Sequence, residues 1–140
     1  MTDHQAIQTL HSIYAEGSSI GDFDQVTRCF TEDGIWDAGV AGVHQGRENM
    51  AKFMAGFVSQ FAYYIQTNSP AIISVDGDTA TSRATVRECG KFRGRDEALE
   101  VMGYYNDDLI RTPGGWKFTR RRFTGLGAHR FALMVGPAIG

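Results

Sequence analysis

A hairpin signal in residues 103–123 constrains the fold of this chain more than any other stretch. The tetrapeptide Thr112-Pro113-Gly114-Gly115 stands between two strand-like runs. Proline presets one backbone dihedral and glycine accepts positive φ, so this tetrapeptide predicts a turn. Side chains alternate between the faces of a strand, yet both faces of this hairpin mix apolar and polar residues. A sheet that is buried on one side only separates the two kinds more cleanly, so we expect one face to line a partly polar cavity.

The hydrophobic spacing changes from helical to strand-like near Phe61. Before that point apolar residues recur at helical spacing, and after it they form extended runs separated by turn residues. His4 and His11 fall off the apolar stripe of the first helix, so we expect both to be solvated. The expected helices are 2–16, 22–30 and 47–60, and the expected strands are 35–39, 63–67, 71–75, 79–90, 97–111 and 116–123.

Helices followed by a meander of antiparallel strands indicate the α+β class. We expect a curved antiparallel sheet that wraps around the N-terminal helices and forms a cone with an internal cavity, a place where small molecules bind. Residues 1–140 are expected to be one domain, with the cone in residues 1–124. Residues 125–140 begin too polar to continue a strand. We therefore expect them to form a tail over the cavity or across a partner subunit.

The charge balance argues against two classes of partner. Fourteen basic and sixteen acidic residues nearly cancel, so we expect binding to neither nucleic acid nor an anionic membrane. No charged-then-apolar leader opens the sequence, and no apolar run approaches the roughly 18 residues that a membrane span needs. A soluble, cytoplasmic protein is therefore expected. Cys29 and Cys89 lack metal-ligand spacing and are interpreted as reduced thiols.

Several short segments occur in the order typical of one known family. They are YA at 14–15, GDFD at 21–24, CFTEDGIW at 29–36, GRENM at 46–50, VDGDTAT at 75–81, GYYND at 103–107 and GWKF at 115–118. With these segments the chain resembles the SnoaL-like family of the nuclear-transport-factor-2-like superfamily. The resemblance implies the cystatin-like roll, a cavity for a hydrophobic small molecule, and a homodimer. We expect the dimer contact on the outer face of the sheet, where apolar side chains would be exposed to solvent in a monomer.

In layout the chain is similar to cofactor-free members of the scytalone dehydratase and dehydrochlorinase types. The resemblance implies an aspartate late in the first helix and a histidine at the start of the strand after the third helix. In such a pair the carboxylate orients an imidazole that moves a proton. Here Ser19 occupies the aspartate position, and residues 63–68 contain no histidine. The catalytic pair of the family is therefore missing from this sequence.

Other side chains become candidates because the pair is missing. The family's strand pattern places Glu88 inward, and a carboxylate facing an apolar hollow has a raised pKa and can act as a general base near neutrality. The alternative is that Glu88 pairs with Arg122 across the sheet. Tyr64 and Tyr105 are expected to donate hydrogen bonds to a substrate carbonyl, or else to serve as amphipathic wall residues. The substrate-binding residues are expected to be Tyr14, Ser19, Trp36, Gln66, Arg122 and His129.

His129 lies in the expected tail, where it either contacts the substrate as part of a lid or lies on the surface. The four histidines show neither His-x-His nor His-x-x-x-His spacing, which argues against a metal site. We expect no cofactor.

Three functional hypotheses follow. The first is a lyase or isomerase that acts by proton transfer on a hydrophobic, carbonyl-bearing or aromatic small molecule. The second is a non-catalytic binder of such a molecule, and the third is an association module. Convergence of Glu88, Tyr64 and Tyr105 on one cavity favours the enzyme, whereas a filled cone favours the module.

Overall fold

The computed structural model describes residues 1–134 and has the expected α+β architecture. Its elements are α1 (Asp3–Ile20), α2 (Phe23–Thr27), β1 (Phe30–Asp37), the 3₁₀ turn η1 (Gly39–Ala41), β2 (Val43–Gln45), α3 (Arg47–Val58), β3 (Phe61–Asn68), β4 (Ile72–Asp76), β5 (Thr79–Phe92), β6 (Glu97–Thr112) and β7 (Gly115–Ala132). Within residues 1–134 the α-helices all fall in the first 60 residues, and the strands that follow pair antiparallel with one another, as predicted.

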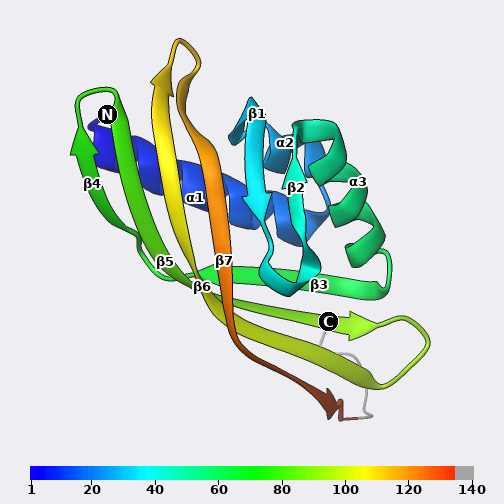
Figure 1. The fold of residues 1–140 in the computed structure, drawn as a ribbon. Coiled ribbons are helices and arrows are strands. Elements are labelled where there is room, and N and C mark those ends of the chain that lie inside the picture. The colour runs from blue at the N-terminus through cyan, green and yellow to red at the C-terminus, as the bar shows by residue number, and fades with distance from the viewer. Residues whose placement is uncertain (135–140) are drawn as a thin grey trace.

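The strands of residues 1–134 form one mixed sheet in the order β2-β1-β7-β6-β5-β3. On the same edge of β5, β3 pairs with Val86–Phe92 and β4 pairs with Thr79–Arg83. The curved hairpin of β6 and β7 is the centre of the sheet (Figure 1). One neighbouring pair is parallel, since β1 runs alongside β7 in the same direction. The strands after residue 60 pair antiparallel with one another as predicted, and β1 adds one parallel pair that makes the whole sheet mixed.

The parallel pairing explains where the second helix ends. Residues 22–30 were expected to be helical, but α2 stops at Thr27 and β1 begins at Phe30. Phe30 is fully buried and pairs in register with Phe118 of β7. The apolar side chain of Phe30 can be buried from a strand as well as from a helix. Pairing with the distant Phe118 therefore decides that its backbone is extended.

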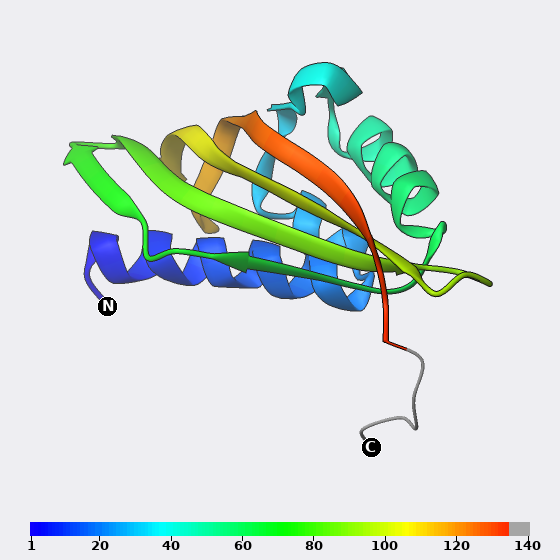
Figure 2. The ribbon, with the colours of Figure 1, turned by 90° about the horizontal axis from the view of Figure 1, so that it is seen from below.

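The first helix continues beyond its predicted end at residue 16. The hydroxyls of Ser18 and Ser19 donate hydrogen bonds to the carbonyls of Tyr14 and Ala15, which keeps both side chains inside the helical frame. α1 ends at Ile20, and Gly21, whose φ is 77°, forms the left-handed cap that glycine favours. Figure 2 shows α1 running along one side of the sheet. There α1 packs against β3, β4 and β7.

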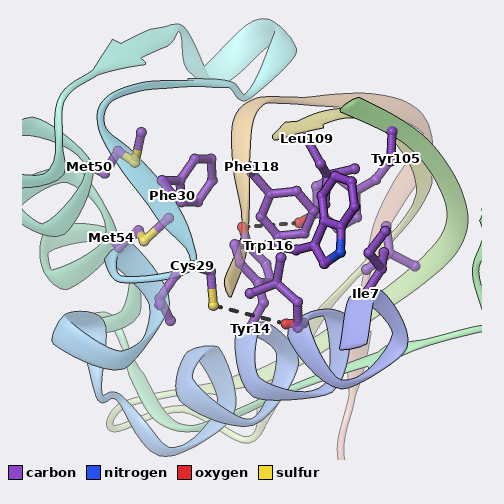
Figure 3. Packing of buried hydrophobic residues seen from close by; sticks show 14 residues of the cluster. Ile7, Tyr14, Cys29, Phe30, Met50, Met54, Tyr105, Leu109, Trp116 and Phe118 are labelled. Atoms are coloured by element: carbon purple, nitrogen blue, oxygen red, sulfur yellow. Dashed lines mark hydrogen bonds between the residues drawn. The ribbon is translucent and has the colours of Figure 1, made fainter. Parts of the chain in front are cut away.

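The core lies between α1 and the sheet. Figure 3 shows Tyr14 of α1 close to Tyr105 of β6 and Phe118 of β7. The Tyr14 ring meets each of the other two edge-on, with ring centres 5.8 and 6.3 Å apart. Fully buried aromatic rings in this geometry are strongly stabilising and fix the position of α1 against the sheet.

Two bulges in β7 change which side chains face the core. Thr119 has no partner residue on β6, and Leu126 has none either. Each extra residue reverses the inward and outward alternation of the residues that follow it. Trp116 and Phe118 therefore point inward before the first bulge, and Arg121 is buried after it.

The expected tail is wrong for residues 125–132, which continue β7 in antiparallel register with β6 as far as Ala132. This stretch has β6 on one side only, because β1 pairs with β7 no further than Arg122. A strand that is half solvated tolerates the polar composition that suggested a tail. The part of the expectation that concerns residues 135–140 lies outside the described residues.

Among residues 1–134, no helix is both long enough and apolar enough to span a membrane.

Candidate active site

A cavity of about 250 Å³ lies between α1, α3 and the inner face of the sheet. Its wall is mostly aromatic and aliphatic, and within the described residues Glu88 is the one charged side chain that lines it. The cone is therefore hollow rather than filled. Aromatic rings from α1, β1, α3, β3 and β6 meet there, namely Tyr14, Trp36, Phe53, Phe57, Tyr64 and Tyr105.

Glu88 reaches the cavity from β5, directly opposite Gln66 of β3. The side-chain amide of Gln66 donates a 2.7 Å hydrogen bond to the Glu88 carboxylate. Burial raises the pKa of Glu88 above its ordinary value, and hydrogen bonds from Tyr64 and Gln66 oppose part of that rise. A carboxylate in this setting is basic enough to remove a proton and is held in one orientation. The alternative partner, Arg122, does not contact it.

Three tyrosines place phenol groups around this carboxylate. The hydroxyls of Tyr14 and Tyr105 lie 3.5 Å apart, and the Gln66 amide nitrogen lies 3.5 Å from the Tyr105 hydroxyl. Burial raises the pKa of Tyr14 to about 12 and raises the pKa values of Tyr64 and Tyr105 well above 10. All three phenols therefore keep their protons across the physiological range and are available as hydrogen-bond donors.

Three residues predicted to bind substrate lie away from the cavity. The Ser19 hydroxyl accepts a 2.9 Å hydrogen bond from the backbone N–H of Gln66 and so serves the packing of α1 on β3. Arg122 points to the outside, 3.6 Å from the carboxylate of Asp37, because the bulge at Thr119 reverses the alternation. His129 lies on exposed β7, 3.6 Å from Glu100. The other predicted residues, Tyr14, Trp36, Tyr64, Gln66, Glu88 and Tyr105, all line the cavity.

A buried polar cluster behind the cavity was missed from the sequence. His11, expected to be solvated, is only 3% exposed. Its Nε2 lies 2.9 Å from the Ser82 hydroxyl, which donates a 2.7 Å hydrogen bond to Asp107. Arg121 donates to His11 Nδ1 at 3.2 Å and pairs with Asp107 at 3.0 Å. The signal in the sequence was Asp107 itself, which alternates with the buried Tyr105 and Leu109 and so belongs to the core face.

This cluster is not a Ser-His-Asp catalytic triad. In a triad the carboxylate holds the imidazole through Nδ1. Here Arg121 occupies that nitrogen, and Asp107 lies on the other side of the ring, 3.4 Å from Nε2, where it also accepts from the serine. Burial, together with the Arg121 charge, lowers the pKa of His11 to about 3. A neutral, weakly basic imidazole beside a fully buried Ser82 cannot activate a nucleophile for an incoming substrate.

A second depression of about 630 Å³ lies along α3 and is open to solvent. It shares Phe53 and Phe57 with the wall of the cavity but contains no carboxylate. The imidazole of His44 in this groove is engaged by the carbonyl of Ala41 at 3.0 Å. The cavity that holds Glu88 is less open to solvent than this depression and therefore offers the better site for chemistry. Within residues 1–134, His, Cys, Asp and Glu side chains form no group of three that could hold a metal ion.

The cavity, the order of elements and the roll of the sheet agree with a family assignment made from the sequence. The family model of the SnoaL-like domain matches residues 1–122. The chain belongs to the SnoaL-like family. A relative of similar sequence is the uncharacterized protein Rv2910c of Mycobacterium tuberculosis, which is 32% identical over 123 residues, covering 86% of this chain and 84% of the relative.

Solved structures of other proteins share this SnoaL-like fold. A Novosphingobium aromaticivorans protein, provisionally named an aromatic ring hydroxylase, is 30% identical with a TM-score of 0.83, covering 92% of this chain and 93% of its own. A hexachlorocyclohexane dehydrochlorinase, LinA type 2, is 18% identical with a TM-score of 0.85, covering 96% of this chain and 94% of its own. The low identity to the dehydrochlorinase means that this likeness concerns the fold alone.

Proposed function

We propose that this SnoaL-like protein is a cofactor-independent lyase or isomerase, resembling a dehydratase, for a hydrophobic small molecule with a carbonyl or aromatic group. The observation that carries the proposal is the position of Glu88. Among the residues that the structure describes, it is the one charged group of an aromatic cavity, its pKa is raised by burial, and it is oriented by Gln66 at 2.7 Å. A general base for chemistry near neutral pH needs these properties.

In the proposed reaction Glu88 removes a proton from the carbon next to a carbonyl group. The C–H electron pair then forms an enolate, and the negative charge moves to the carbonyl oxygen. Tyr105, whose phenol stays protonated, donates a hydrogen bond to this oxygen. Tyr64 donates to Glu88 before the reaction and can donate to the oxygen once Glu88 has taken the proton, so both phenols stabilise the charge as it develops. The enolate then either expels a leaving group, which Glu88 can protonate, or takes the proton back at another carbon.

The size and the walls of the cavity limit the substrate. A dry cavity of about 150 Å³ accommodates benzene, so a cavity of about 250 Å³ suits a compound of one or two rings. Aromatic walls favour a flat, apolar substrate. The names of the two structural neighbours, a provisionally named aromatic ring hydroxylase and a hexachlorocyclohexane dehydrochlorinase, also refer to ring compounds for those proteins.

Deuterium exchange tests the proposal without knowledge of the complete reaction. Aromatic ketones and hydroxyketones are incubated with the protein in D₂O, and uptake of deuterium at the carbon next to the carbonyl is followed by NMR. We expect exchange with the wild type and a loss of about two to four orders of magnitude with Glu88→Gln, the usual cost of removing a base. Glu48→Gln on the exposed face of α3 is the control and should keep the full rate. Exchange at an equal rate with Glu88→Gln would refute the proposal.

A non-catalytic binder is the second candidate, and the observation that favours it is the residue at the family's aspartate position. Ser19 offers no carboxylate there, and its hydroxyl is engaged by backbone groups of α1 and β3. Native mass spectrometry of the purified protein tests this candidate. A retained small molecule, with no deuterium exchange in any ketone of the panel, would favour the binder.

We further propose a homodimer through the outer face of the sheet. Tyr63 and Ile65 of β3 are 56% and 51% exposed, and Met102 of β6 is exposed on the same sheet. Apolar side chains gathered in this way usually mark an interface. Light scattering should give twice the chain mass at micromolar concentration, and Ile65→Asp should shift it toward the monomer. A monomeric wild type would refute this proposal.

A further inference from the structure

Arg121 is a fully buried cation directly behind the tyrosines of the cavity. Its guanidinium carbon lies 3.7 Å from the ring centre of Tyr105, 4.3 Å from that of Tyr14 and 4.6 Å from that of Phe118. Figure 3 shows these three rings together in the core. Tyr14 and Tyr105 line the cavity, whereas Arg121 does not. The charge therefore acts on the cavity through the two phenol rings.

The counter-ion of Arg121 lies away from the cavity. Asp107 pairs with Arg121 Nε at 3.0 Å, and its second oxygen accepts a hydrogen bond from Ser82. Neither Asp107, Ser82 nor His11 lines the cavity. The ion pair is therefore a dipole with its positive end at the phenol rings.

Burial of this arginine is costly and not fully compensated. Removing a guanidinium from water costs several kcal/mol unless its donors find partners. Within residues 1–134, Arg121 Nη1 has no hydrogen-bond partner. An aliphatic side chain would fill the same space beside Phe118 without this penalty, so packing alone does not account for a cation here.

We propose that Arg121 is a positioning residue that makes the hydroxyl ends of Tyr14 and Tyr105 a binding site for an oxyanion. This inference rests on the proposed function and deepens it. During proton abstraction, negative charge leaves Glu88 and appears on the substrate oxygen. When the substrate oxygen binds at the tyrosine hydroxyls, the Arg121 cation behind the rings stabilises negative charge on that oxygen more than negative charge on Glu88. The cation therefore favours the state after proton transfer. The site would thus select substrates whose oxygen becomes anionic, such as enolisable ketones and phenols.

The probe for this site is 4-nitrophenol, because its absorbance distinguishes the bound phenol from the bound phenolate. The titratable groups around Arg121 are His11 and Tyr14 from α1, Cys29 after α2, Glu88 from β5, and Asp107 and Tyr105 from β6. An ionised Glu88 would oppose a phenolate, so the titration is run in wild type and in Glu88→Gln. We expect Glu88→Gln to bind the phenolate in preference to the phenol.

Variants of Arg121 are then made in the Glu88→Gln protein. Arg121→Met should lower the bound ratio of phenolate to phenol about tenfold, because the phenol rings lose a desolvated cation–π partner. Arg121→Lys keeps the charge, so its bound ratio of phenolate to phenol should stay close to that of the Arg121 protein. The double change Arg121→Met with Asp107→Asn removes both charges and is the version to use if Arg121→Met alone does not fold. Arg120→Met is the matched control, since Arg120 contacts Asp37 on the outside and should leave the ratio unchanged.

Two results would overturn the proposal. One is that Glu88→Gln binds no nitrophenol or prefers its neutral form. The other is that folded variants without Arg121 keep the same ratio, which would make the arginine purely structural. The probe undergoes no turnover, so the result is independent of the deuterium exchange that tests Glu88. Deuterium exchange without a phenolate preference would reject only the proposed role of Arg121. A phenolate preference without deuterium exchange would reject only the proposed enzyme activity.

Discussion

The amide nitrogen of Gln66 lies 2.7 Å from a carboxylate oxygen of Glu88, across the neighbouring strands β3 and β5. The two residues are direct partners in the strand register, so the backbone holds the hydrogen bond in place without a turn or a loop. An uncharged donor leaves Glu88 with its raised pKa, whereas an ion pair with an arginine would have depressed it. This pairing is what separates a candidate base from a structural salt bridge.

Removing the Gln66 amide should make Glu88 a weaker acid. In Gln66→Leu the carboxylate loses a hydrogen bond that favours its charged form, so the pKa of Glu88 should rise above its wild-type value. NMR titration of the Glu88 carboxyl carbon gives this pKa directly. Gln60→Leu, at the exposed end of the α3–β3 connection, should leave it unchanged. A Glu88 pKa that is unaltered or lower in Gln66→Leu would mean that the 2.7 Å contact does not stabilise the carboxylate.

His11 should make the protein sensitive to acid. Its pKa falls from 6.5 to about 3 on folding, so the folded state binds the proton less tightly than the unfolded state. The stability that results is present above pH 6.5 and is lost as the pH falls toward 3. Within that window this one group should lower the free energy of unfolding by about 1.4 kcal/mol per pH unit.

Urea unfolding at several pH values tests this expectation with His11→Gln. At neutral pH the variant should lose about 1–3 kcal/mol, because Ser82 and Arg121 lose their partner. The difference from wild type should shrink as the pH falls below 6. His4→Gln on the exposed side of α1 is the control and should follow the wild type at every pH. A constant difference between His11→Gln and wild type would show that the imidazole titrates normally.

The sequence predicted the fold well because its signals are local and agree with one another. The Thr112-Pro113-Gly114-Gly115 turn sets the β6–β7 hairpin, and alternation along β5, read with the strand pattern of the SnoaL-like family, placed Glu88 on the inner face. Such features depend on residues close in the chain. The parallel contact of β1 with β7 joins Phe30 to Phe118, and a buried phenylalanine near a helix end carries no sign of such a distant partner.

The candidate site was predicted only in part, for a physical reason that can be traced to Thr119. Simple alternation from Trp116 assigns Arg122 to the inner face, but the bulge at Thr119 moves Arg121 there instead. No turn residue marks this bulge in the sequence. His11 was misplaced for a related reason, because a polar residue beside an apolar stripe looks solvated until its buried partners are known.

Gly103 should be the least replaceable glycine of the hairpin. A Cβ there would lie 2.4 Å from the backbone oxygen of Thr124 and 2.6 Å from the ring of Phe123. Backbone cannot yield as a flexible side chain does, so Gly103→Ala should destabilise the protein by about 1–3 kcal/mol. Gly127, almost opposite on β7, has no atom within 4 Å of its Cβ position, and Gly127→Ala should be nearly neutral. Equal melting temperatures for the two variants would contradict the close approach of β6 and β7 at Gly103.

Glu88→Gln should separate activity from stability. Burial raises the pKa of Glu88 on folding, so the folded state holds that proton more tightly than the unfolded state. The stability this gives is present below the ordinary pKa of 4.5 and is lost as the pH rises through the folded-state value. Because glutamine cannot ionise, the variant should be as stable as wild type in acid and more stable at neutral pH. Functional sites commonly carry such a stability cost.

The same variant should lose about two to four orders of magnitude in rate on any ketone that shows exchange. His129→Ala is the informative comparison, because His129 is exposed beside Glu100 and does not line the cavity. It should keep nearly full activity and change the free energy of unfolding by less than about 1 kcal/mol. Urea unfolding at pH 4 and pH 8 and the exchange rates, measured for both variants, test these expectations. If Glu88→Gln kept full activity while His129→Ala lost it, β7 rather than β5 would carry the chemistry. A Glu88→Gln protein less stable than wild type at pH 8 would instead mean that the carboxylate stabilises the fold and is not held there for proton transfer.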